Sequence, residues 1–377
     1  MTVENGGNEA GMPLKGVRVL DLTRLLPGGY ATLILASMGA DVVKVEDKKA
    51  GDYTRLFGKQ VEGQGSFHHM LNRGKKSVTL DLKDPQDRLR FEDLVKTSDL
   101  LMESFRPGVL EALGYGLTAL HALAPHLVVC SISGFGQTGP MREDPAHDLN
   151  LLAWSGLLDR QRGADGKPVM PPVAWADVLV GTNAALYSIP YLSMPRSNRK
   201  GVHIDLAMAE AVALLPTRIL ADILVGAAVP KGPDYVFADG NPAYGVYRAK
   251  DGFVSVAAVE DHFARNLYSL AGLDYEMSKD RTAEGRRAAI ARFSDFFAQR
   301  SVAELLEADR QAHACIAEVL SVEDMLGTDQ ALSRGFVASE GIPSAGLPVL
   351  VNGQRLRAAG SAPRQGEHNT EFFDTDA

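Results

Sequence analysis

His147 and Asp177 lie thirty positions apart in surroundings that suit proton transfer. His147 precedes Asp148 and an apolar stretch, so Asp148 is expected to cap a helix that has His147 at its start. Asp177 closes the apolar approach PPVAWAD and precedes a second apolar helix, where it could also act simply as a helix cap. An imidazole has an ordinary pKa of about 6.5, and a carboxylate can exchange proton-transfer roles with it at neutral pH. The pair is therefore a candidate acid–base site.

A glycine-rich segment, SGFGQTGP at residues 133–140, follows a predicted strand. Its composition suits backbone N–H groups that point toward a ligand or a developing negative charge, although a plain loop has the same composition. Lys83 and Arg106 lie just beyond two other predicted strands. Because open parallel sheets bind ligands at the carboxyl ends of their strands, both cations are candidate ligand contacts.

A basic cluster of Arg73, Lys75 and Lys76 precedes another predicted strand. Such a cluster is typical of a solvated face, and it is also suited to binding phosphates. The earlier segment LLPGGY lacks the G-x-G-x-x-G pattern of dinucleotide-binding turns, although Glu46 stands where an acid would bind a ribose. We interpret its residues 27–29 as a sharp turn into a helix.

The candidate residues sit on alternating strands and helices. Apolar, β-branched runs predict the strands, and apolar residues at helical spacing predict the helices. The predicted strands cover residues 17–22, 41–45, 77–82, 99–102, 126–133 and 202–207, and the predicted helices cover 33–38, 84–97, 177–189 and 208–225, the last broken near Pro216. This alternation predicts an α/β fold with a parallel sheet in a Rossmann-like domain.

A Gly- and Pro-rich stretch at residues 226–245 is the best candidate for a domain boundary. Beyond it, strands at 244–249 and 253–258 joined by Lys-Asp-Gly predict a hairpin, and helices follow. We predict a disordered tail at residues 1–12, a large domain over 13–225 and a smaller α+β domain over 226–331.

The composition is that of an ordinary globular protein, with 377 residues, 45% of them hydrophobic and 23% charged. A net charge of −8 argues against general affinity for nucleic acid, and no window is apolar enough for a membrane span, so we expect a cytoplasmic protein. Cys130 and Cys315 have neither metal-ligand nor redox spacing. We expect both to be small buried residues and predict no metal site.

Several segments, in order, resemble the family of class III CoA-transferases and α-methylacyl-CoA racemases. The resemblance runs from about residue 14 to about residue 351. It is carried by GVRVLDLTRLLPGGYATLILASMGADVVKVE, NRGKKSVTLDLK, ESFRPGVLEALGYG, SGFGQTGP, AHDLNLLAWSG, the acid of WADVLVG, and DGFVSVAAVEDHF. It implies a Rossmann-like, CoA-binding large domain completed by residues 332–377. It also implies an interlocked homodimer, with each active site between the large domain of one chain and the small domain of the other.

Two reactions in this family share one acid. The resemblance implies that a transferase would use Asp177 as a nucleophile, forming an acyl anhydride and then an aspartyl-CoA thioester. A racemase would pair Asp177 with His147 on opposite faces of the α-carbon, and Glu260 of the partner subunit would support the histidine. The segment AHDLNL is similar to the GHDINY segment of the racemases. We therefore predict a racemase of 2-methylacyl-CoA thioesters that acts through an enolate, with a class III CoA-transferase as the alternative.

The resemblance also implies where coenzyme A would lie. We expect the coenzyme as part of the acyl-CoA substrate, without a separate cofactor. The implied contacts are Leu80, Asp81, Leu82, Lys83, Ser104, Phe105, Arg106, Ala146, Asp148, Leu149, Asn150 and Leu151.

The chain departs from the family pattern at three places. Residues 178–180, VLV, follow the acid where the racemases carry a glycine-rich run. Ala112 and Asp47 stand where family members often have an arginine, and the two lysines after Asp47 could substitute there. These differences leave open the acyl group, the transferase alternative and a non-catalytic, thioester-binding paralogue.

Overall fold

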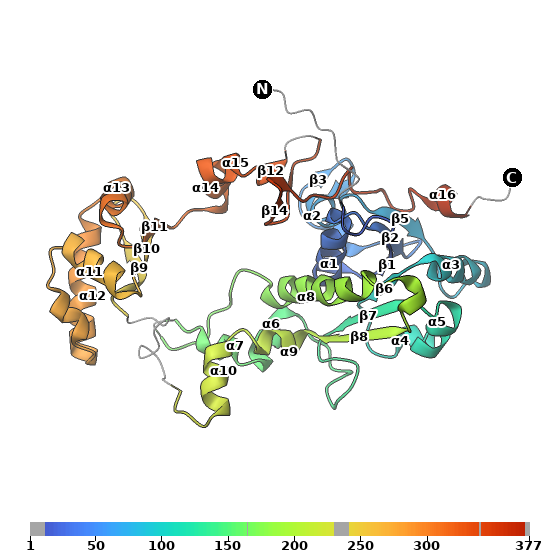
Figure 1. Cartoon of the computed structure of the whole chain (residues 1–377), viewed down its shortest axis with the longest axis horizontal. Helices are drawn as coiled ribbons and strands as arrows, with labels where there is room; N and C mark the ends of the chain where they lie inside the picture. The colour runs from blue at the N-terminus through green and yellow to red at the C-terminus, as the bar shows by residue number, and fades with distance from the viewer. Residues whose placement is uncertain (1–11, 164, 230–240, 339–340, 374–377) are drawn as a thin grey trace. The chain divides into compact units, whose positions relative to one another are not determined.

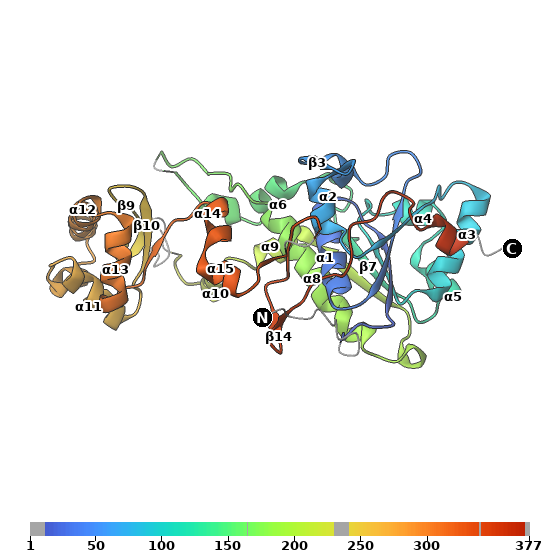
Figure 2. The same cartoon turned by 90° about the horizontal axis from the view of Figure 1, so that it is seen from above.

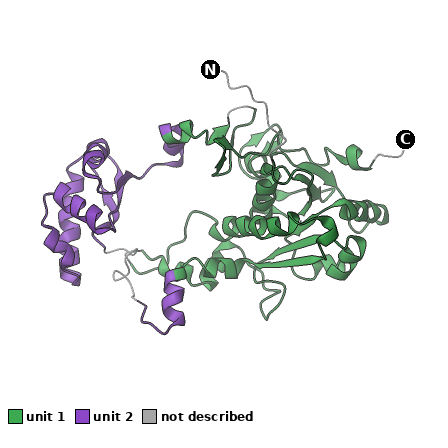
Figure 3. Cartoon of the chain, viewed as in Figure 1, with its two compact units in different colours: residues 1–217, 330–377 green, residues 218–329 purple. Residues whose placement is uncertain are grey.

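The computed structural model describes residues 12–163, 165–229, 241–338 and 341–373. Residues 1–11 of the predicted tail and much of the predicted boundary stretch lie outside the described residues. The chain forms two compact units (Figure 3). The large unit comprises residues 1–217 and 330–377, and the small unit comprises residues 218–329.

Within the described part of the large unit, parallel strands form a six-stranded sheet in the order β5-β2-β1-β6-β7-β8 (Figure 1). Their bounds are β1 Arg18–Leu22, β2 Asp41–Glu46, β5 Lys76–Thr79, β6 Leu100–Glu103, β7 Val128–Ser133 and β8 Val202–Ala207. Helices cover both faces, so the central strands are near-continuous apolar runs, and every residue of β7 is buried. The predicted α/β fold with a parallel sheet is confirmed.

The strand order reverses at β1, which pairs with β2 on one side and β6 on the other. Leu22 at the end of β1 pairs with Glu103 at the end of β6. Glu46 at the end of β2 pairs with Thr79 at the end of β5. The carboxyl ends of these four strands therefore lie along one edge, where doubly wound sheets bind their ligands.

Different helices cover the two faces of this sheet (Figure 1 and Figure 2). One face carries α1 Leu25–Ser37, α8 Trp175–Leu192 and α9 Met208–Ala213, and the other carries α3 Pro85–Thr97 and α5 Leu117–Leu123. Neighbouring strand residues point to opposite faces, so Val19 belongs to the core under α1 and Leu20 to the core under α3. The sheet thus separates two apolar cores.

The turn from β1 into α1 is shorter than the sequence suggested. Thr23 and Arg24 make it, and Leu25, the first residue of α1, adopts a left-handed φ of 61°. Residues 27–29 (PGG) lie inside α1, which corrects their interpretation as the turn itself. Proline is tolerated there because an N–H in the first helical turn has no helical partner. Gly28 is required by close approach, since a Cβ there would lie 2.1 Å from the Cβ of Thr23.

The C-terminal segment returns to the edge of the large sheet. The backbone N–H of His368 donates to the carbonyl oxygen of Ser77 at 2.9 Å. The N–H of Thr79 donates to Oδ1 of Asn369, also at 2.9 Å. Because β5 is an edge strand, these bonds pair backbone groups that would otherwise face solvent.

The small unit is an antiparallel sheet packed on helices. β9 Tyr244–Arg248 and β10 Phe253–Ala257 form the predicted hairpin, and β11 Ile316–Glu318 pairs with β10. An aromatic core joins this sheet to α11 Asp261–Leu270, α12 Ala283–Ala298 and α13 Val302–Ala312. The hairpin and the helices predicted after it are confirmed.

Short elements complete the described chain, and α10 Thr217–Leu224 follows the predicted break at Pro216. The others are η2 Tyr53–Leu56, β3 Gln60–Val61, β4 Gln64–Gly65, α2 Ser66–Leu71, α4 Val109–Ala112, α6 Asp148–Trp154, α7 Leu157–Arg160, η3 Arg196–Asn198, η5 Tyr275–Lys279, α14 Val322–Gly327, α15 Asp329–Ser333, β12 Val337–Ala338, β13 Ser344–Ala345, β14 Leu350–Val351, β15 Gln354–Arg355 and α16 Asn369–Phe373. Among the residues described, no helix combines the length and apolarity needed to cross a bilayer.

Candidate functional site

His147 is the N-cap residue of α6. Its backbone N–H donates to Oδ1 of Asn150 at 3.1 Å, which closes the first turn of the helix. The imidazole itself is exposed. His147 is therefore fixed through its backbone while its ring remains accessible to a ligand.

Asp177 lies in the first turn of α8 and is half-buried. Burial is the main cause that raises its pKa, to about 6, and the negative charge of Asp148 adds to it. His147 acts in the opposite direction and lowers this pKa. A carboxyl group with a pKa near 6 can both accept and release a proton close to neutral pH.

Asp148 connects the two helix starts. Its Oδ1 accepts hydrogen bonds from the backbone N–H groups of Ala176 at 2.6 Å and of Asp177 at 3.4 Å. The sequence predicted that Asp148 caps its own helix, but the carboxylate caps α8 instead. The reason is that the N-cap residue of α8 is Ala174, which has no side-chain acceptor.

The apolar residues after Asp177 form part of α8 and face its packing partners. Val180 is fully buried, and Leu179 packs against the core between α8 and the sheet. The backbone N–H of Val178 donates to the carbonyl of Ala174 at 3.2 Å, so it is a helical hydrogen bond donor. The absence of the expected glycine-rich run is thus accommodated by a regular helix.

A cavity of about 360 Å³, here called the sheet-end cavity, lies at the carboxyl ends of β1, β2, β5 and β6. It brings together Leu80, Asp81, Leu82, Lys83 and Phe105, which are predicted ligand contacts from two separate strands. Ser104 lies beside them, because its Oγ accepts a hydrogen bond from the N–H of Arg24 at 3.1 Å. The cavity is lined by Leu22, Thr23, Arg24, Lys44, Val45, Glu46, Asp47, Gly51, Asp52, Leu80, Asp81, Leu82, Lys83, Phe105, Val109 and Leu113.

Sequence reasoning did not assign Arg24 to the site, although its place directly after β1 was a usable signal. The Arg24 guanidinium lies 5.9 Å from the ring centroid of Phe105 and 5.8 Å from that of Tyr53. Lys48, one candidate substitute for the missing arginine, instead pairs with Asp87 at 2.5 Å. The cations that line the cavity therefore come from β1, β2 and the end of β5.

A buried ion network lies behind this cavity. Lys44 pairs with Asp52 at 2.8 Å, and Lys75 lies 3.4 Å from Asp21, whose other oxygen accepts from Thr23. Burial alone would raise the pKa of Asp52, but Lys44 lowers it to about 2. Burial lowers the pKa of Lys75 to about 8.

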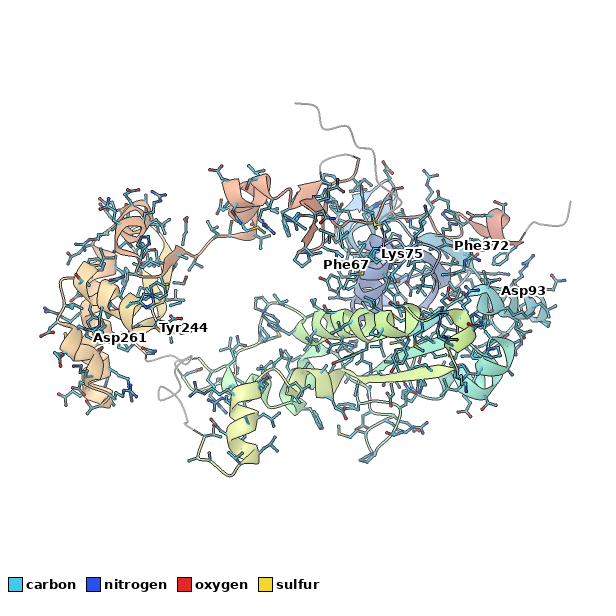
Figure 4. The ribbon with its side chains drawn as sticks, viewed as in Figure 1. Phe67, Lys75, Asp93, Tyr244, Asp261 and Phe372 are labelled. Carbon is cyan, nitrogen blue, oxygen red and sulfur yellow. The ribbon has the colours of Figure 1, made fainter. Side chains whose placement is uncertain are left out.

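The basic cluster has a structural role. For Lys75, both interpretations of the cluster, a solvated face and a phosphate-binding site, are wrong. Lys75, labelled in Figure 4, is buried beside α1 and donates to the carbonyl of Gly29 at 3.1 Å. Lys76 pairs with Glu371 at 2.6 Å, and Arg73 donates to the carbonyl of Ile342. The partner of Lys75 thus belongs to α1, and those of Lys76 and Arg73 belong to the C-terminal part of the large unit.

Other predicted contacts are distributed more widely. Arg106 is exposed and lines a separate cavity of about 490 Å³ that also contains the buried Glu103. In the glycine-rich segment, the N–H of Gln137 donates to the carboxylate of Asp205 at 3.0 Å, so this donor already has a partner. Near His147, the predicted residues range from the exposed Leu149 and Asn150 through the half-buried Ala146 and Asp148 to the fully buried Leu151.

An apolar groove of about 420 Å³ begins two residues before Asp177. Trp175, at the start of α8, and Leu152, in the second half of α6, connect it to the two helices that carry the proposed acid and base. The groove is lined by Leu152, Leu157, Leu158, Arg160, Gln161, Pro171, Trp175 and Leu215. An aliphatic group attached near Asp177 would find matching surroundings here.

Glu260 belongs to the small unit, where it is the exposed N-cap residue of α11 and makes no side-chain cap hydrogen bond. Within the described residues, no group of three or more His, Cys, Asp or Glu side chains is arranged to hold a metal ion. Burial raises the pKa of Cys130 to about 12, so its thiol is unreactive at neutral pH.

Residues 14–369 match the model of a family described as CoA-transferase family III. The chain belongs to this family. It is 30% identical to "Succinate--glutarate CoA-transferase" of Agrobacterium fabrum over 96% of this chain and 95% of the relative. It is 32% identical to the human "Alpha-methylacyl-CoA racemase" over 96% of this chain and 93% of the relative. The resemblance inferred from the sequence is confirmed.

A solved structure supports the same assignment of fold. The crystal structure of a CAIB/BAIF family protein from Brucella suis superposes with a TM-score of 0.84 at 28% identity, over 96% of this chain and 98% of that one. The relatives in CoA-transferase family III include both transferases and racemases. The chain is therefore an enzyme of the class III CoA-transferase family, whose relatives catalyse two different reactions.

Proposed function

We propose that this member of CoA-transferase family III is a racemase that inverts the α-carbon of 2-methylacyl-CoA thioesters, with His147 and Asp177 as its two bases. The observation that carries the proposal is the pairing of an accessible histidine with a carboxyl group whose pKa is raised to about 6. Two bases that exchange one proton at neutral pH work best when neither holds it strongly.

In the proposed reaction, one base removes the α-proton and the C–H electron pair moves into the thioester carbonyl, which becomes an enolate. The conjugate acid on the other side returns a proton to the opposite face. No net oxidation occurs. The substrate and the two bases together hold the same number of protons before and after each turnover.

Coenzyme A would bind as part of the substrate, with its nucleotide at the sheet-end cavity. Lys83 and Arg24 supply cations suited to phosphate oxygens, and Phe105 supplies an aromatic face for the base. The apolar groove beside Asp177 suits an uncharged, branched or aliphatic acyl group. These features favour a 2-methylacyl thioester over a dicarboxylate.

We also propose a homodimer in which Glu260 of the partner subunit orients His147. Its exposure and its lack of a capping role in α11 leave its carboxylate available for such a contact. Mixing the inactive variants His147→Ala and Glu260→Ala should restore activity, because a mixed dimer would contain one intact site. Recovery would not occur if each site were built from one chain.

The principal test uses 2-methyldecanoyl-CoA of one configuration in deuterated water. Mass spectrometry should show one deuterium at the α-carbon, and chiral analysis should show loss of optical purity. His147→Ala should abolish both, while Asp93→Asn, an exposed substitution on α3, should leave both unchanged. Wild-type protein that neither exchanges nor racemises a panel of 2-methylacyl thioesters would contradict the proposal.

The second candidate is a CoA-transferase with Asp177 as nucleophile, favoured by the transferase relatives. In that reaction the carboxylate attacks the thioester carbonyl, forms an acyl anhydride and releases CoA thiolate. The thiolate then attacks the aspartyl carbonyl of the anhydride, which forms an aspartyl-CoA thioester and releases the donor acid as a carboxylate. Hydroxylamine added with acyl-CoA should then modify Asp177. In contrast to the racemase, the His147→Ala variant should retain substantial activity.

A further inference from the structure

The first backbone N–H groups of α8 do not all find hydrogen-bond acceptors in the residues just before the helix. A helix begins with N–H groups that lack helical acceptors. At α8, Trp175 N–H donates to the carbonyl of Val173 at 3.0 Å, and Val178 N–H donates to that of Ala174 at 3.2 Å. The N–H groups of Ala176 and Asp177 have no such acceptor, and the Asp148 carboxylate accepts a hydrogen bond from each of them.

Asp148 stands at the first position of α6, so its carboxylate joins two different helices. The α6 start is closed separately by Asn150, which leaves Asp148 available to α8. The 2.6 Å bond to Ala176 is the stronger of its two contacts, and the 3.4 Å approach to Asp177 is weaker. The residue next to His147 is thus bonded to the turn that carries Asp177.

We propose that Asp148 is a positioning residue with two effects: its carboxylate fixes the first turn of α8 relative to His147, and its negative charge sits beside Asp177. The inference rests on the proposed role of Asp177 as the reacting acid. It applies equally to the racemase and to the transferase, because both use this carboxyl group.

The charges around α8 support the second effect. Asp148 raises the pKa of Asp177, after burial, and His147 lowers it. The helices α1, α6 and α9 and the strands β7 and β8 pack against α8. α1 and β7 contain no charged residue, Glu210 of α9 is exposed, and on β8 Asp205 is hydrogen-bonded to Gln137 while burial lowers the pKa of His203.

Two substitutions separate the effects. Asp148→Asn keeps a side-chain oxygen that can accept from Ala176 but removes the charge. Asp148→Ala removes both the acceptor and the charge. Asp93→Asn makes the same change in net charge at an exposed site and serves as the control.

The sign of the expected shift follows from removal of a neighbouring negative charge. In Asp148→Asn, the ionised form of Asp177 is less disfavoured, so its pKa falls. The acidic limb of the kcat/KM profile with 2-methyldecanoyl-CoA should move to lower pH by roughly one unit. In Asp148→Ala, the same shift should be joined by a loss of roughly tenfold or more in kcat, since a small misplacement of reacting groups is costly.

A substrate-independent measurement keeps this inference separate from the proposed function. In protein labelled with ¹³C at the aspartate carboxyl carbons, the Asp177 signal is assigned by its loss in Asp177→Asn. Its titration midpoint should fall in Asp148→Asn and stay constant in Asp93→Asn. Wild-type protein without racemase or transferase activity would refute the proposed function and leave this titration readable.

Either of two results would overturn the inference. One is an Asp177 midpoint and an acidic limb that do not change in Asp148→Asn. The other is an Asp148→Ala variant whose kcat equals that of Asp148→Asn, because the hydrogen bonds to α8 would then have no positioning effect. If Asp148→Ala does not fold, the Asp148→Asn comparison still decides the role of the charge.

Discussion

Gly181 packs directly against the backbone of Pro27, where α8 crosses α1. A Cβ at Gly181 would lie 2.5 Å from the carbonyl oxygen of Pro27, closer than real Cβ atoms approach a backbone oxygen. The Cβ of Tyr30 would be 3.2 Å away. Gly181 lies one helical turn after Asp177. The contact at Gly181 sets how closely α8 approaches α1, and it therefore determines the position of the Asp177 carboxyl group.

We predict that Gly181→Ala destabilises the protein and lowers activity together. The added methyl group meets backbone, which cannot rotate away, so α8 must shift from α1. The expected cost is about 1–3 kcal/mol in the free energy of unfolding, measured with urea. Gly327→Ala is the control, because no heavy atom lies within 4 Å of its added Cβ. Equal stability of Gly181→Ala and wild type would contradict the crossing geometry.

Asp177→Asn should abolish the reaction and yet stabilise the fold at neutral pH. The folded-state pKa of Asp177 is about 6, above the ordinary aspartate value of 3.8, so the folded protein holds this proton more tightly than the unfolded chain. Stability contributed by the group is therefore complete below pH 4 and is lost as pH rises through 6. Because the group is only partly buried, we expect Asp177→Asn to be more stable by about 1–3 kcal/mol at pH 7.5.

Urea unfolding of wild type and Asp177→Asn at several pH values measures this difference. It should vanish below pH 3.8, where Asp177 becomes protonated in the folded and unfolded states alike. A difference that is independent of pH would show that the amide acts through packing and not through titration.

The sequence was sufficient to predict the parallel sheet, the hairpin and the family. These depend on local patterns, such as the apolar run of β7, and on motifs read in order. It was not sufficient to predict that Lys75 is buried. Adjacent lysines look alike in a sequence, but only tertiary folding places one beside Asp21 and leaves the other at a sheet edge.

In the candidate site, too, some features could be predicted from the sequence and others depend on tertiary folding. Lys83 was predicted because it follows a strand of a parallel sheet, and Phe105 was implied by the family resemblance; the sheet-end cavity contains both. The use of Asp148 by α8 could not be predicted, because it depends on the approach of two helices that are not consecutive in the chain, with α7 between them. Leu25 shows a further limit, since nothing in its residue type indicates a left-handed φ.

Replacement of Glu260 should lower the activity of the protein without changing its stability. Its side chain is exposed and does not cap α11, so Glu260→Gln should change the free energy of unfolding by less than about 0.5 kcal/mol. If Glu260 orients His147 of the partner subunit as proposed, kcat should fall by roughly tenfold or more. Loss of stability without loss of activity would indicate a structural role in the small unit.

Lys75 and Lys76 provide a matched pair of neighbouring lysines. Lys75→Met removes a buried partner of Asp21 and should cost about 3–5 kcal/mol in the free energy of unfolding. Lys76→Met removes an ion pair with Glu371 that is partly exposed, and should cost no more than about 1 kcal/mol. Urea unfolding of both variants at one pH measures the contrast. Similar costs for the two would mean that burial of Lys75 contributes little.

Lys83→Ala should weaken the binding of coenzyme A without affecting the fold. The side chain lines the sheet-end cavity and is exposed, so its removal leaves no buried group unpaired. Loss of one cation near a phosphate should raise the Kd for CoA roughly five- to tenfold at low salt, and the difference should shrink as salt screens the contact. Isothermal titration calorimetry at two ionic strengths measures both effects. Lys96→Ala, on the exposed face of α3, is the control, and the nucleotide would have to bind elsewhere if both variants bound CoA equally well.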